Sequence, residues 1–415
     1  MFSWNKKIQA GALQYVLVIA IIIFIILLSF VQLVQVQQRL SVKNSLYKEA
    51  ILNTTNGFKF VTKSQLGDRS EISVKFSGNP KETTEIAKGS WGVFDLIKVS
   101  SKVNKEFFQK IALIGNYSKT QKAIYLTDNN TPLVVVGNTK ITGTAYLPKR
   151  GIKRGNIGGN SYYGNVLVNG ATRVSSSSLS LNSRLKNLNN FSASSFDSKE
   201  IQLKEGDKLV QSFNRETLIY RDYLPIKLQD ISLQGNIIVQ SQSKIIVSRD
   251  SELLDIILIA PEIIIESGTK ATFQAIATKR IEVGSNVQLA YPSYLAVTYK
   301  STKIEENHGV FIGENCLLKG GVCFLQKESK ERNLEPQIKI DISTKVIGEV
   351  FCQGNTEILG TVHGEVSTNN FITKQLGTRY INHLYNAVIN SRELPDEFVG
   401  VTGDSNKKGV AKWLY

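Results

Sequence analysis

The spacing of hydrophobic positions changes twice along this 415-residue chain. Residues 10–38 carry no charge, and their centre, Tyr15–Val34, is almost wholly aliphatic. At about 1.5 Å rise per residue, about twenty helical residues span the hydrocarbon core of a bilayer. The pattern therefore predicts a transmembrane helix over 11–34, preceded by a short basic tail over 1–10.

A cleaved signal peptide is the competing interpretation of this run. Its apolar region would cover about 7–15 residues and would lead into a small-x-small cleavage site. Here the apolar run is longer and continues into Gln32–Arg39, where no such site occurs. An uncleaved anchor is therefore favoured, because its only requirement is apolar length.

The basic residues that flank the run give only a weak preference for orientation. Lys6 and Lys7 lie on one side, and Arg39, Lys43 and Lys48 lie on the other, so the positive-inside count is nearly balanced. We expect the amino-terminal tail to lie inside, because the bulk of the chain has the turn-rich β pattern of an extracytoplasmic protein. The expected localisation is the inner membrane, crossed once, with most of the chain extracytoplasmic.

After the apolar run, the hydrophobic spacing first stays helical and then becomes strand-like. Leucine and valine positions over 35–52 predict an amphipathic stalk that continues the helix. A small β-rich domain of unidentified fold is predicted over 53–128, with a turn at Gly78-Asn-Pro80. Its predicted strands are Phe58–Val61, Ile72–Phe76, Trp91–Val99 and Lys110–Gly115.

The region Ile231–Ile372 consists of short runs of branched aliphatic residues separated by Gly, Asn and Ser turns. The runs lie too close together for crossover helices, so they form either an antiparallel sandwich or barrel, or the coils of a parallel β-solenoid. The alternation in Val346–Cys352 and Ile358–Val366 favours the solenoid. Alternate residues of a strand share a face, so Ile, Val and Gly would point inward, while Glu349 and His363 would point outward.

The predicted fold class is therefore mainly β: a parallel β-helix (solenoid) preceded by a single N-terminal transmembrane helix and a small β-rich domain. The β-helix is predicted over 129–375. Serine-rich and polar sequence predicts an excursion from it near 175–230, with one helix between Asn182 and Phe196. Residues 376–415 are predicted to form a cap and a tail, because the last coil of a solenoid needs a cover.

The inner pattern Ile358-x-Gly-x-Val-x-Gly-x-Val resembles the bactofilin or polymer-forming family. That resemblance implies short β-helices that stack end to end into filaments and recruit wall-modifying partners. The junction at Gly11 resembles the start of a prepilin or minor pilin, with Lys6 and Lys7 before it and an apolar helix after it. It implies processing after Gly11, although Val16 stands where most pilins carry Glu.

Charge adds a preference for anionic partners. Lys+Arg 50 against Asp+Glu 35 gives a net charge of +15, which suits lipid head groups, anionic glycan or nucleic acid. No basic cluster is interleaved with aromatics, so specific nucleic-acid binding is not predicted. The densest basic cluster is Lys149, Arg150, Lys153 and Arg154, in a Gly-rich loop that is the predicted anion contact. A nucleotide loop is disfavoured, because Gly-Lys-Ser/Thr and a following helix are missing.

Candidate catalytic and metal-binding residues are scattered. Asp-x-Asp pairs are absent, and the three histidines have no metal-ligand spacing, so no catalytic residue, metal or cofactor is predicted. The three cysteines exclude a disulfide framework. Cys316 and Cys323 remain a candidate disulfide across Gly320-Gly321, while Cys352 is expected to point inward as a small apolar residue.

These features predict a membrane-anchored structural or interaction protein of a bacterial cell envelope, such as an accessory of a filament or a secretion or pilus-like system, rather than an enzyme. The expected partners are membrane lipid through the helix, further copies of the chain or another envelope protein, and an anionic glycan or lipid. The alternative is a membrane-bound carbohydrate-active β-helix enzyme, which requires carboxylates that converge in a groove along one face.

Overall fold

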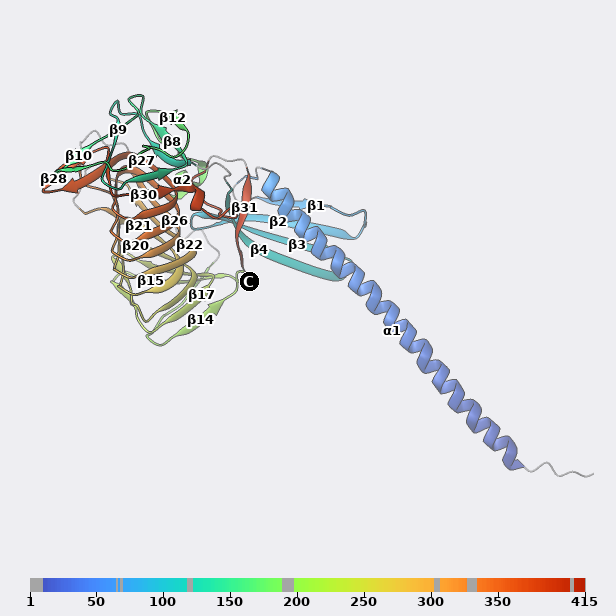
Figure 1. Cartoon of the computed structure of the whole chain (residues 1–415). Coiled ribbons are helices and arrows are strands. Elements are labelled where there is room, and N and C mark those ends of the chain that lie inside the picture. Colours follow the sequence, from blue (N-terminus) through green and yellow to red (C-terminus); the bar gives the residue numbers. More distant parts are fainter. Residues whose placement is uncertain are drawn as a thin grey trace, which may run out of the picture. The chain divides into compact units, whose positions relative to one another are not determined.

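The protein is mainly β, with one long helix in its amino-terminal part (Figure 1). The computed structural model describes residues 10–64, 66–67, 70–117, 122–188, 198–301, 307–326, 334–403 and 407–414. Two compact units are distinguished. The first comprises the chain up to Lys59 with Ile72–Ile86 and Val99–Gln109, and the second comprises Phe60–Glu71, Ala87–Lys98 and Lys110–Tyr415.

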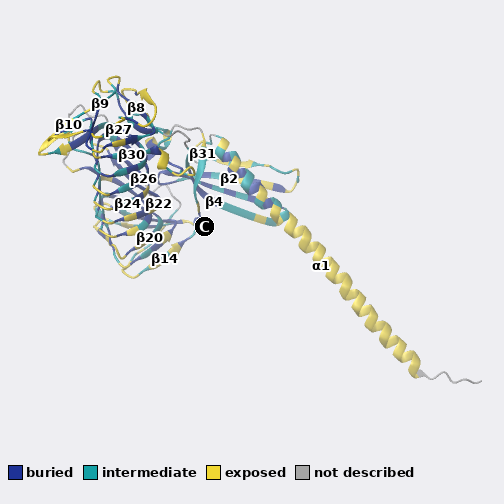
Figure 2. Cartoon of the chain, in the orientation of Figure 1, coloured by how far each residue is buried: buried dark blue, intermediate teal, exposed yellow. Residues whose placement is uncertain are grey.

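Helix α1 (Ala10–Lys63) changes character along its length. Over residues 11–45 every side chain is exposed, as the yellow part of the helix in Figure 2 shows. This part is long and apolar enough to cross a membrane. From Ala50 onward, buried residues recur three or four positions apart, which is the spacing of one helical face. They are Ala50, Asn53, Thr54, Gly57, Phe58 and Val61.

The strand predicted at Phe58–Val61 is wrong, because these residues lie in the last turns of α1. Phe58 and Val61 are buried on the same helical face, three residues apart. A four-residue segment with apolar residues at its first and last positions fits a helical period as well as a strand period. The predicted stalk therefore extends beyond residue 52, and the boundary at 53 falls inside the helix.

Within the first unit, the buried face of α1 packs against strand residues. An ideal Cβ on Gly57 would lie 2.6 Å from Val99 Cγ1, so the helix approaches the strand as closely as glycine allows. The Tyr47 and Phe108 rings meet edge to face with centroids 5.7 Å apart. The Thr54 hydroxyl donates to the Ala50 carbonyl at 2.9 Å. Close packing of this kind fixes the axial position of the helix.

A five-stranded sheet of order β1-β2-β3-β4-β31 follows the helix. Its strands are β1 (Glu71–Val74), β2 (Glu82–Trp91), β3 (Phe94–Val103), β4 (Glu106–Asn116) and β31 (Lys408–Leu414). The strand predicted over Trp91–Val99 is divided in two by a turn at Gly92, whose φ is +59°. The two-residue turns before β3 and β4 make these strands antiparallel to their predecessors. The carboxyl-terminal β31 pairs antiparallel with β4, placing Trp413 opposite Ala112.

Most of the second unit is a set of parallel strands, which we call the parallel stack. The strands pair in parallel with one another, mostly with strands formed later in the chain, and the pairings link into a closed barrel with additional strands. Its strands are β5 (Lys122–Leu126), β7 (Lys140–Thr142), β8 (Thr144–Leu147), β12 (Thr172–Val174), β13 (Ser198–Glu200), β14 (Lys208–Gln211), β15 (Thr217–Asp222), β16 (Ile226–Leu228), β17 (Ser232–Gly235), β18 (Ile237–Ser241), β19 (Lys244–Val247), β20 (Glu252–Ile265), β21 (Lys270–Val283), β22 (Gln288–Tyr299), β23 (Gly309–Ile312), β24 (Leu317–Gln326), β25 (Ile338–Ile340), β26 (Lys345–Ile358), β27 (Thr361–Gln375) and β30 (Val388–Asn390).

Smaller elements decorate the stack. A three-stranded parallel sheet contains β29 (His383–Tyr385), β6 (Leu133–Val136) and β9 (Ile152–Arg154), in that order. Two antiparallel pairings add β28 (Thr378–Ile381) to β27, and β10 (Asn156–Ile157) to β11 (Asn160–Ser161). Besides α1, the helices in the described residues are α2 (Ser183–Leu188) and the 3-10 turn η2 (Ser391–Glu393). The helix predicted between Asn182 and Phe196 thus begins as α2, while residues 189–196 lie outside the described residues.

Buried aliphatic side chains stand in register from one strand of the stack to the next. One ladder runs through nine paired positions, all at most 1% exposed: Val239, Leu258, Ala275, Leu295, Val322, Val350, Val366, Ile124 and Ala145. A second ladder runs from Ile245 through Ile263, Ile281, Val310 and Ile338. The inward direction predicted for Val346, Val350, Cys352, Val362 and Val366 is confirmed, because all of them lie in this core.

The order of strands in the stack differs from their order in the chain. Val366 of β27 pairs with Ile124 of β5, so the strands formed first by the chain lie beyond those formed last. Residues 376–415, predicted as a cap and a tail, therefore do not simply end the stack, because β30 pairs in parallel with both β27 and β7. The predicted excursion over 175–230 is also too long, because β13–β16 already pair in parallel with later strands.

Glycines form a ladder where adjacent backbones approach closely. Gly320, Gly348 and Gly364 occupy paired positions and have φ values of +138°, +145° and +150°. A Cβ on Gly348 would lie 1.8 Å from the Gly320 carbonyl oxygen, and one on Gly364 would lie 1.7 Å from the Gly348 oxygen. Only glycine fits both the conformation and the space.

One outward face of the stack is apolar and is covered within the second unit. Trp91, Phe94 and Leu113 of the sheet share a buried cluster with Ile257, Tyr294 and Cys323 of the stack. The Asp95 carboxylate forms ion pairs with Lys408, whose Nζ lies 3.1 Å away, and with Lys88, whose Nζ lies 3.7 Å away. Arg184 also forms an ion pair with Asp95. Three cations around one buried carboxylate offset its desolvation.

Glu349 points away from the inner core, as predicted, but it is only 4% exposed. The carboxyl-terminal segment covers it, and its carboxylate accepts hydrogen bonds from the Val401 amide at 2.7 Å and the Thr402 hydroxyl at 2.6 Å. Burial raises the pKa of Glu349, although these hydrogen bonds act in the opposite direction. A side chain that points away from the inner core is therefore not necessarily exposed to solvent in this protein.

We expect Gly348→Ala to destabilise the second unit, because the added methyl group must displace the Gly320 carbonyl. Overpacking of this kind costs about 1–3 kcal/mol. Thermal melts of the full chain in detergent measure the effect. Gly78→Ala is the matched control, since nothing lies within 4 Å of its Cβ position. Equal melting temperatures for the two variants would show that the glycine ladder is not required.

Candidate functional site

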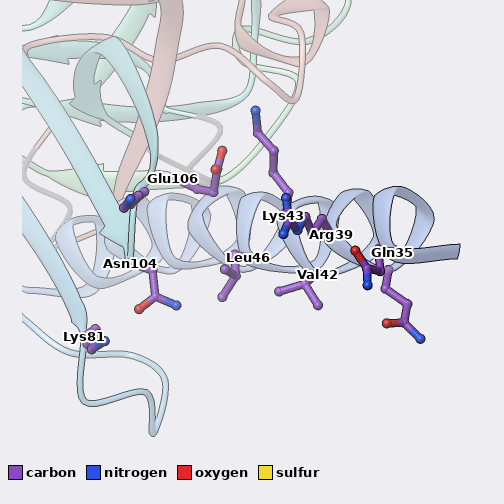
Figure 3. A pocket seen from close by; sticks show the side chains of 10 residues that line it. Gln35, Arg39, Val42, Lys43, Leu46, Lys81, Asn104 and Glu106 are labelled. Atoms are coloured by element: carbon purple, nitrogen blue, oxygen red, sulfur yellow. The ribbon is translucent and has the colours of Figure 1, made fainter. Parts of the chain in front are cut away.

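The first unit carries an open cavity of about 840 Å³ beside α1, which we call the basic crevice (Figure 3). One wall comes from the helix and the other from two strand connections. The lining residues are Gln35, Gln38, Arg39, Val42, Lys43, Leu46, Lys81, Asn104, Lys105 and Glu106.

The helical wall combines charge with apolar surface. Arg39 and Lys43 are four residues apart, as are Val42 and Leu46, so each pair occupies one side of the helix. Figure 3 shows Val42 and Leu46 projecting to the same side, while Lys43 extends away from them. Val42 is 60% exposed, and Arg39 and Lys43 are also exposed. The wall therefore offers cations and uncovered apolar side chains at once.

The opposite wall is held by two tight turns. Asn104 has a φ of +55°, a conformation that asparagine tolerates better than most residues, and it begins the connection from β3 to β4. Its amide donates to the Lys81 carbonyl at 3.2 Å, which holds the two connections side by side. The Lys81 amide in turn donates to the Asn79 side-chain carbonyl at 3.0 Å. Lys81 and Lys105 thus project from a fixed backbone.

A hydrogen-bond network joins this wall to the helix. The Ser77 hydroxyl lies 2.6 Å from a carboxylate oxygen of Glu49 on α1 and 2.6 Å from one of Glu82 on β2. Glu82 also accepts the amides of Phe76 at 2.8 Å and Ser77 at 2.6 Å. Burial alone would raise the pKa of Glu82, but these hydrogen bonds outweigh burial and hold the pKa below its usual value.

The chemistry of the crevice is that of an anion site. Four of its lining residues are basic, namely Arg39, Lys43, Lys81 and Lys105, and Glu106 is its single carboxylate. Its lining includes no histidine, cysteine or paired carboxylates, so it lacks a nucleophile and an acid–base pair. The arrangement can bind and orient a negatively charged group that also has an apolar part.

The basic loop predicted as the anion contact forms a different surface. Lys149 and Arg150 lie in the turn before β9, whereas Lys153 and Arg154 lie within β9, and all four are exposed. Adjacent residues of a strand point to opposite faces, so Lys153 and Arg154 do not converge. The Arg154 guanidinium donates to the Asn165 carbonyl at 3.2 Å. Anion binding by this loop stays a prediction.

The candidate disulfide between Cys316 and Cys323 is not formed, and all three cysteines are free and buried. Cys316 precedes β24 and Cys323 lies in its middle. Seven residues of extended strand separate Cα atoms by about 20 Å or more, far beyond the roughly 7 Å that a disulfide permits. The intervening Gly320-Gly321 belongs to the same strand and does not form a turn between two strands.

A second cavity, which we call the polar groove, lies in the second unit and encloses about 320 Å³. It is lined by Asn307, His308, Phe311, Glu335, Pro336, Gln337, Lys339, Glu357, Ile372, Lys374 and Arg379. Glu357 is 5% exposed and accepts the Lys374 amide at 3.0 Å. Burial raises the pKa of Glu357. Glu335 instead pairs with Arg379, so the two carboxyls of the groove have different surroundings.

The remaining candidate residues are dispersed over the second unit. His308 stacks on Tyr299 with ring centroids 4.0 Å apart, and burial lowers the pKa of both His363 and His383. Asp255 pairs with Lys412 and Asp341 with Lys339, so these carboxylates serve separate ion pairs. Within the described ranges, no cluster of three metal-ligating side chains occurs.

Comparison with known proteins returned no relative. No protein-family model matches the chain, and no curated protein and no solved structure matches it either.

The sequence prediction missed the basic crevice, because its two walls are far apart in the chain. The available signal was the combination of Arg39 and Lys43, directly after the uncharged run, with lysines at two asparagine-containing turns. Nothing in the linear sequence places Lys81 or Lys105 beside Arg39. That proximity follows from the packing of α1 on β-strand residues.

We expect Glu82→Gln to loosen the loop at 76–82 most strongly at neutral pH. Because the folded-state pKa of Glu82 lies below 4.5, its stabilisation is present above that pH and is lost as pH falls through the folded pKa. Amide hydrogen exchange in this loop, corrected for intrinsic rates, should differ between wild type and variant at pH 7 and converge in acid. The exposed Glu85 provides the control, Glu85→Gln. A difference that is independent of pH would contradict this role.

Proposed function

We propose that this protein is a membrane-anchored structural or interaction component of a bacterial cell envelope, an accessory of a filament or of a secretion or pilus-like system. The observation that supports the proposal is that the two halves of α1 have different surroundings. Its first half is apolar and exposed, and its second half is bound to a folded β unit. An exposed helix of this composition needs a bilayer or other apolar helices around it.

The in-register ladders support a β-helix as the architecture of the parallel stack. Each circuit adds one strand to each ladder and buries aliphatic side chains on those of its neighbours. We propose on this basis, and on the resemblance to bactofilins, that the stack serves as a rigid scaffold. Rigid repetitive stacks present side chains at fixed spacing, which suits a partner-binding role in the envelope.

The proposed topology has a single pass through the inner membrane and most of the chain extracytoplasmic. The prepilin-like junction at Gly11 supports a link to a pilus-like system, and the apolar surface from Leu13 onward is available for helix packing. Val16 replaces the Glu that most pilins carry at this position. The proposal therefore rests on the apolar helix and not on a charge within it.

Arginines introduced at Ile22 and Ile26 are expected to release the protein from the membrane. Each costs about 2.5–3.5 kcal/mol of insertion free energy at a helix centre. Carbonate extraction of cells followed by fractionation measures the outcome, and Ile22→Leu with Ile26→Leu is the control. Wild type and control should remain in the pellet, whereas the arginine variant should become soluble. Retention of the arginine variant in the pellet would contradict anchoring by α1.

The polar groove favours a second candidate function, a membrane-bound carbohydrate-active enzyme. Glycoside hydrolysis needs one carboxyl kept protonated and a second kept ionised. Glu357, whose burial raises its pKa, matches the first role, and Glu335 is a second carboxyl in the same lining.

A test of this candidate is the release of reducing ends from acidic and neutral bacterial polysaccharides. If the groove is catalytic, Glu357→Gln should reduce the rate at least about 100-fold, as expected for loss of a general acid. Asp250→Asn, whose carboxylate pairs with Arg249 outside the groove lining, serves as the control. No release of reducing ends by the wild-type protein would remove the candidate.

A further inference from the structure

We propose that the basic crevice binds the head group of an anionic phospholipid from the bilayer that α1 crosses. The inference rests on the proposed anchoring by α1 and adds a specific ligand. It is carried by three properties of the crevice: its depth relative to the apolar segment, its charge and its mixed lining.

Depth along the helix axis places the crevice at the lipid surface. If Tyr15–Val34 fills the hydrocarbon core, Arg39 lies about 7–8 Å beyond its edge, at 1.5 Å per residue. The head-group layer on each side is about 5–8 Å thick. Arg39 therefore lies at the outer part of this layer, and the Lys43 side chain can reach back toward it. Lys81 and Lys105 line the same cavity.

Charge favours an anionic over a zwitterionic head group. Four cations against one carboxylate leave an excess of three positive charges, counted from Arg39, Lys43, Lys81 and Lys105 against Glu106. A zwitterionic lipid brings no net charge and leaves that excess unchanged. An anionic lipid lowers it by one and contributes phosphate oxygens that accept hydrogen bonds from guanidinium and ammonium groups.

The lining favours a lipid over a soluble anion. Val42 and Leu46 belong to the same lining as the four basic residues, and Val42 is 60% exposed. Such side chains add nothing to the binding of a free phosphate. Val36, which is 54% exposed and about 3 Å beyond the edge of the hydrocarbon core at 1.5 Å per residue, can contact the glycerol backbone of a lipid. The exposed apolar surface continues along α1 through Val36 and Val34 into the membrane segment. A lipid can thus keep its chains along the helix while its phosphate enters the crevice.

The cavity is also formed in advance. Lys81 and Lys105 are carried on turns joined by the Asn104–Lys81 backbone hydrogen bond, and Ser77 links the β1–β2 connection to Glu49 of the helix. A preformed site loses less entropy on binding than a set of independent surface lysines. This property separates the crevice from the loop at 149–154, whose cations do not converge.

Native mass spectrometry of the full chain in neutral detergent tests the proposal, with phosphatidylglycerol or phosphatidylcholine added in steps. The variant R39Q/K43Q/K81Q/K105Q removes the crevice cations. The variant K149Q/R150Q/K153Q/R154Q removes the same formal charge elsewhere. Wild type and loop variant should retain phosphatidylglycerol over phosphatidylcholine, and the crevice variant should lose this preference about tenfold or more. Thermal melts check that each variant is folded, and R39Q/K43Q alone replaces the fourfold variant if that one does not fold.

Three outcomes would overturn the inference. Equal retention of phosphatidylglycerol by the crevice variant would show that the crevice is not the site. Equal losses in both fourfold variants would show a dependence on net charge only. Displacement of the lipid by an equal concentration of soluble glycerol phosphate would show a phosphate site without lipid contacts. Failure of anchoring itself is seen separately, since the carbonate extraction described above would then leave the wild-type chain in the soluble fraction.

Discussion

The parallel stack depends on one constraint: each strand must place an aliphatic side chain directly on that of the neighbouring strand. The ladder from Val239 to Ala145 meets this condition at nine successive positions, all of them buried. Because adjacent strands are only about 4.8 Å apart, no circuit can be displaced without breaking both its hydrogen bonds and its packing. The glycine ladder follows from the same condition, since Gly320, Gly348 and Gly364 face carbonyl oxygens in contact distance.

The same constraint explains why the chain returns on itself. Without a further partner, β27 would have an open edge of unpaired backbone N–H and C=O groups. Such an edge can pair with other chains and lead to aggregation. The early strand β5 pairs there instead, and β8 and β12 continue the order. The early part of the chain therefore closes the end at which the long strands finish. Outward-facing residues such as Glu349 and Tyr294 are covered in the same way by segments from other parts of the chain.

Local patterns in the sequence were sufficient to predict those structural features that repeat over many residues. The exposed apolar part of α1 and the inward direction of Val346–Val366 follow from periods that are unambiguous over their length. Phe58–Val61 was misassigned because four residues cannot distinguish the two periods. The division of Trp91–Val99 into two strands depends on the conformation of Gly92 alone. The return of β5, the pairing of β31 and the meeting of the two walls of the basic crevice depend on long-range packing, which no local pattern in the sequence specifies.

The proposed anchoring places residues 15–34 in the bilayer and the basic crevice at its surface. Depth measurements by electron paramagnetic resonance test it most directly, using a nitroxide on a cysteine introduced at Ile22 or at Asn44 of the full chain in vesicles. The native thiols are buried with raised pKa values, so they compete poorly for the label. If residues 15–34 lie in the bilayer, oxygen relaxes the label at 22 and a water-soluble nickel complex relaxes the label at 44. Equal accessibility of both positions to the nickel complex would contradict it.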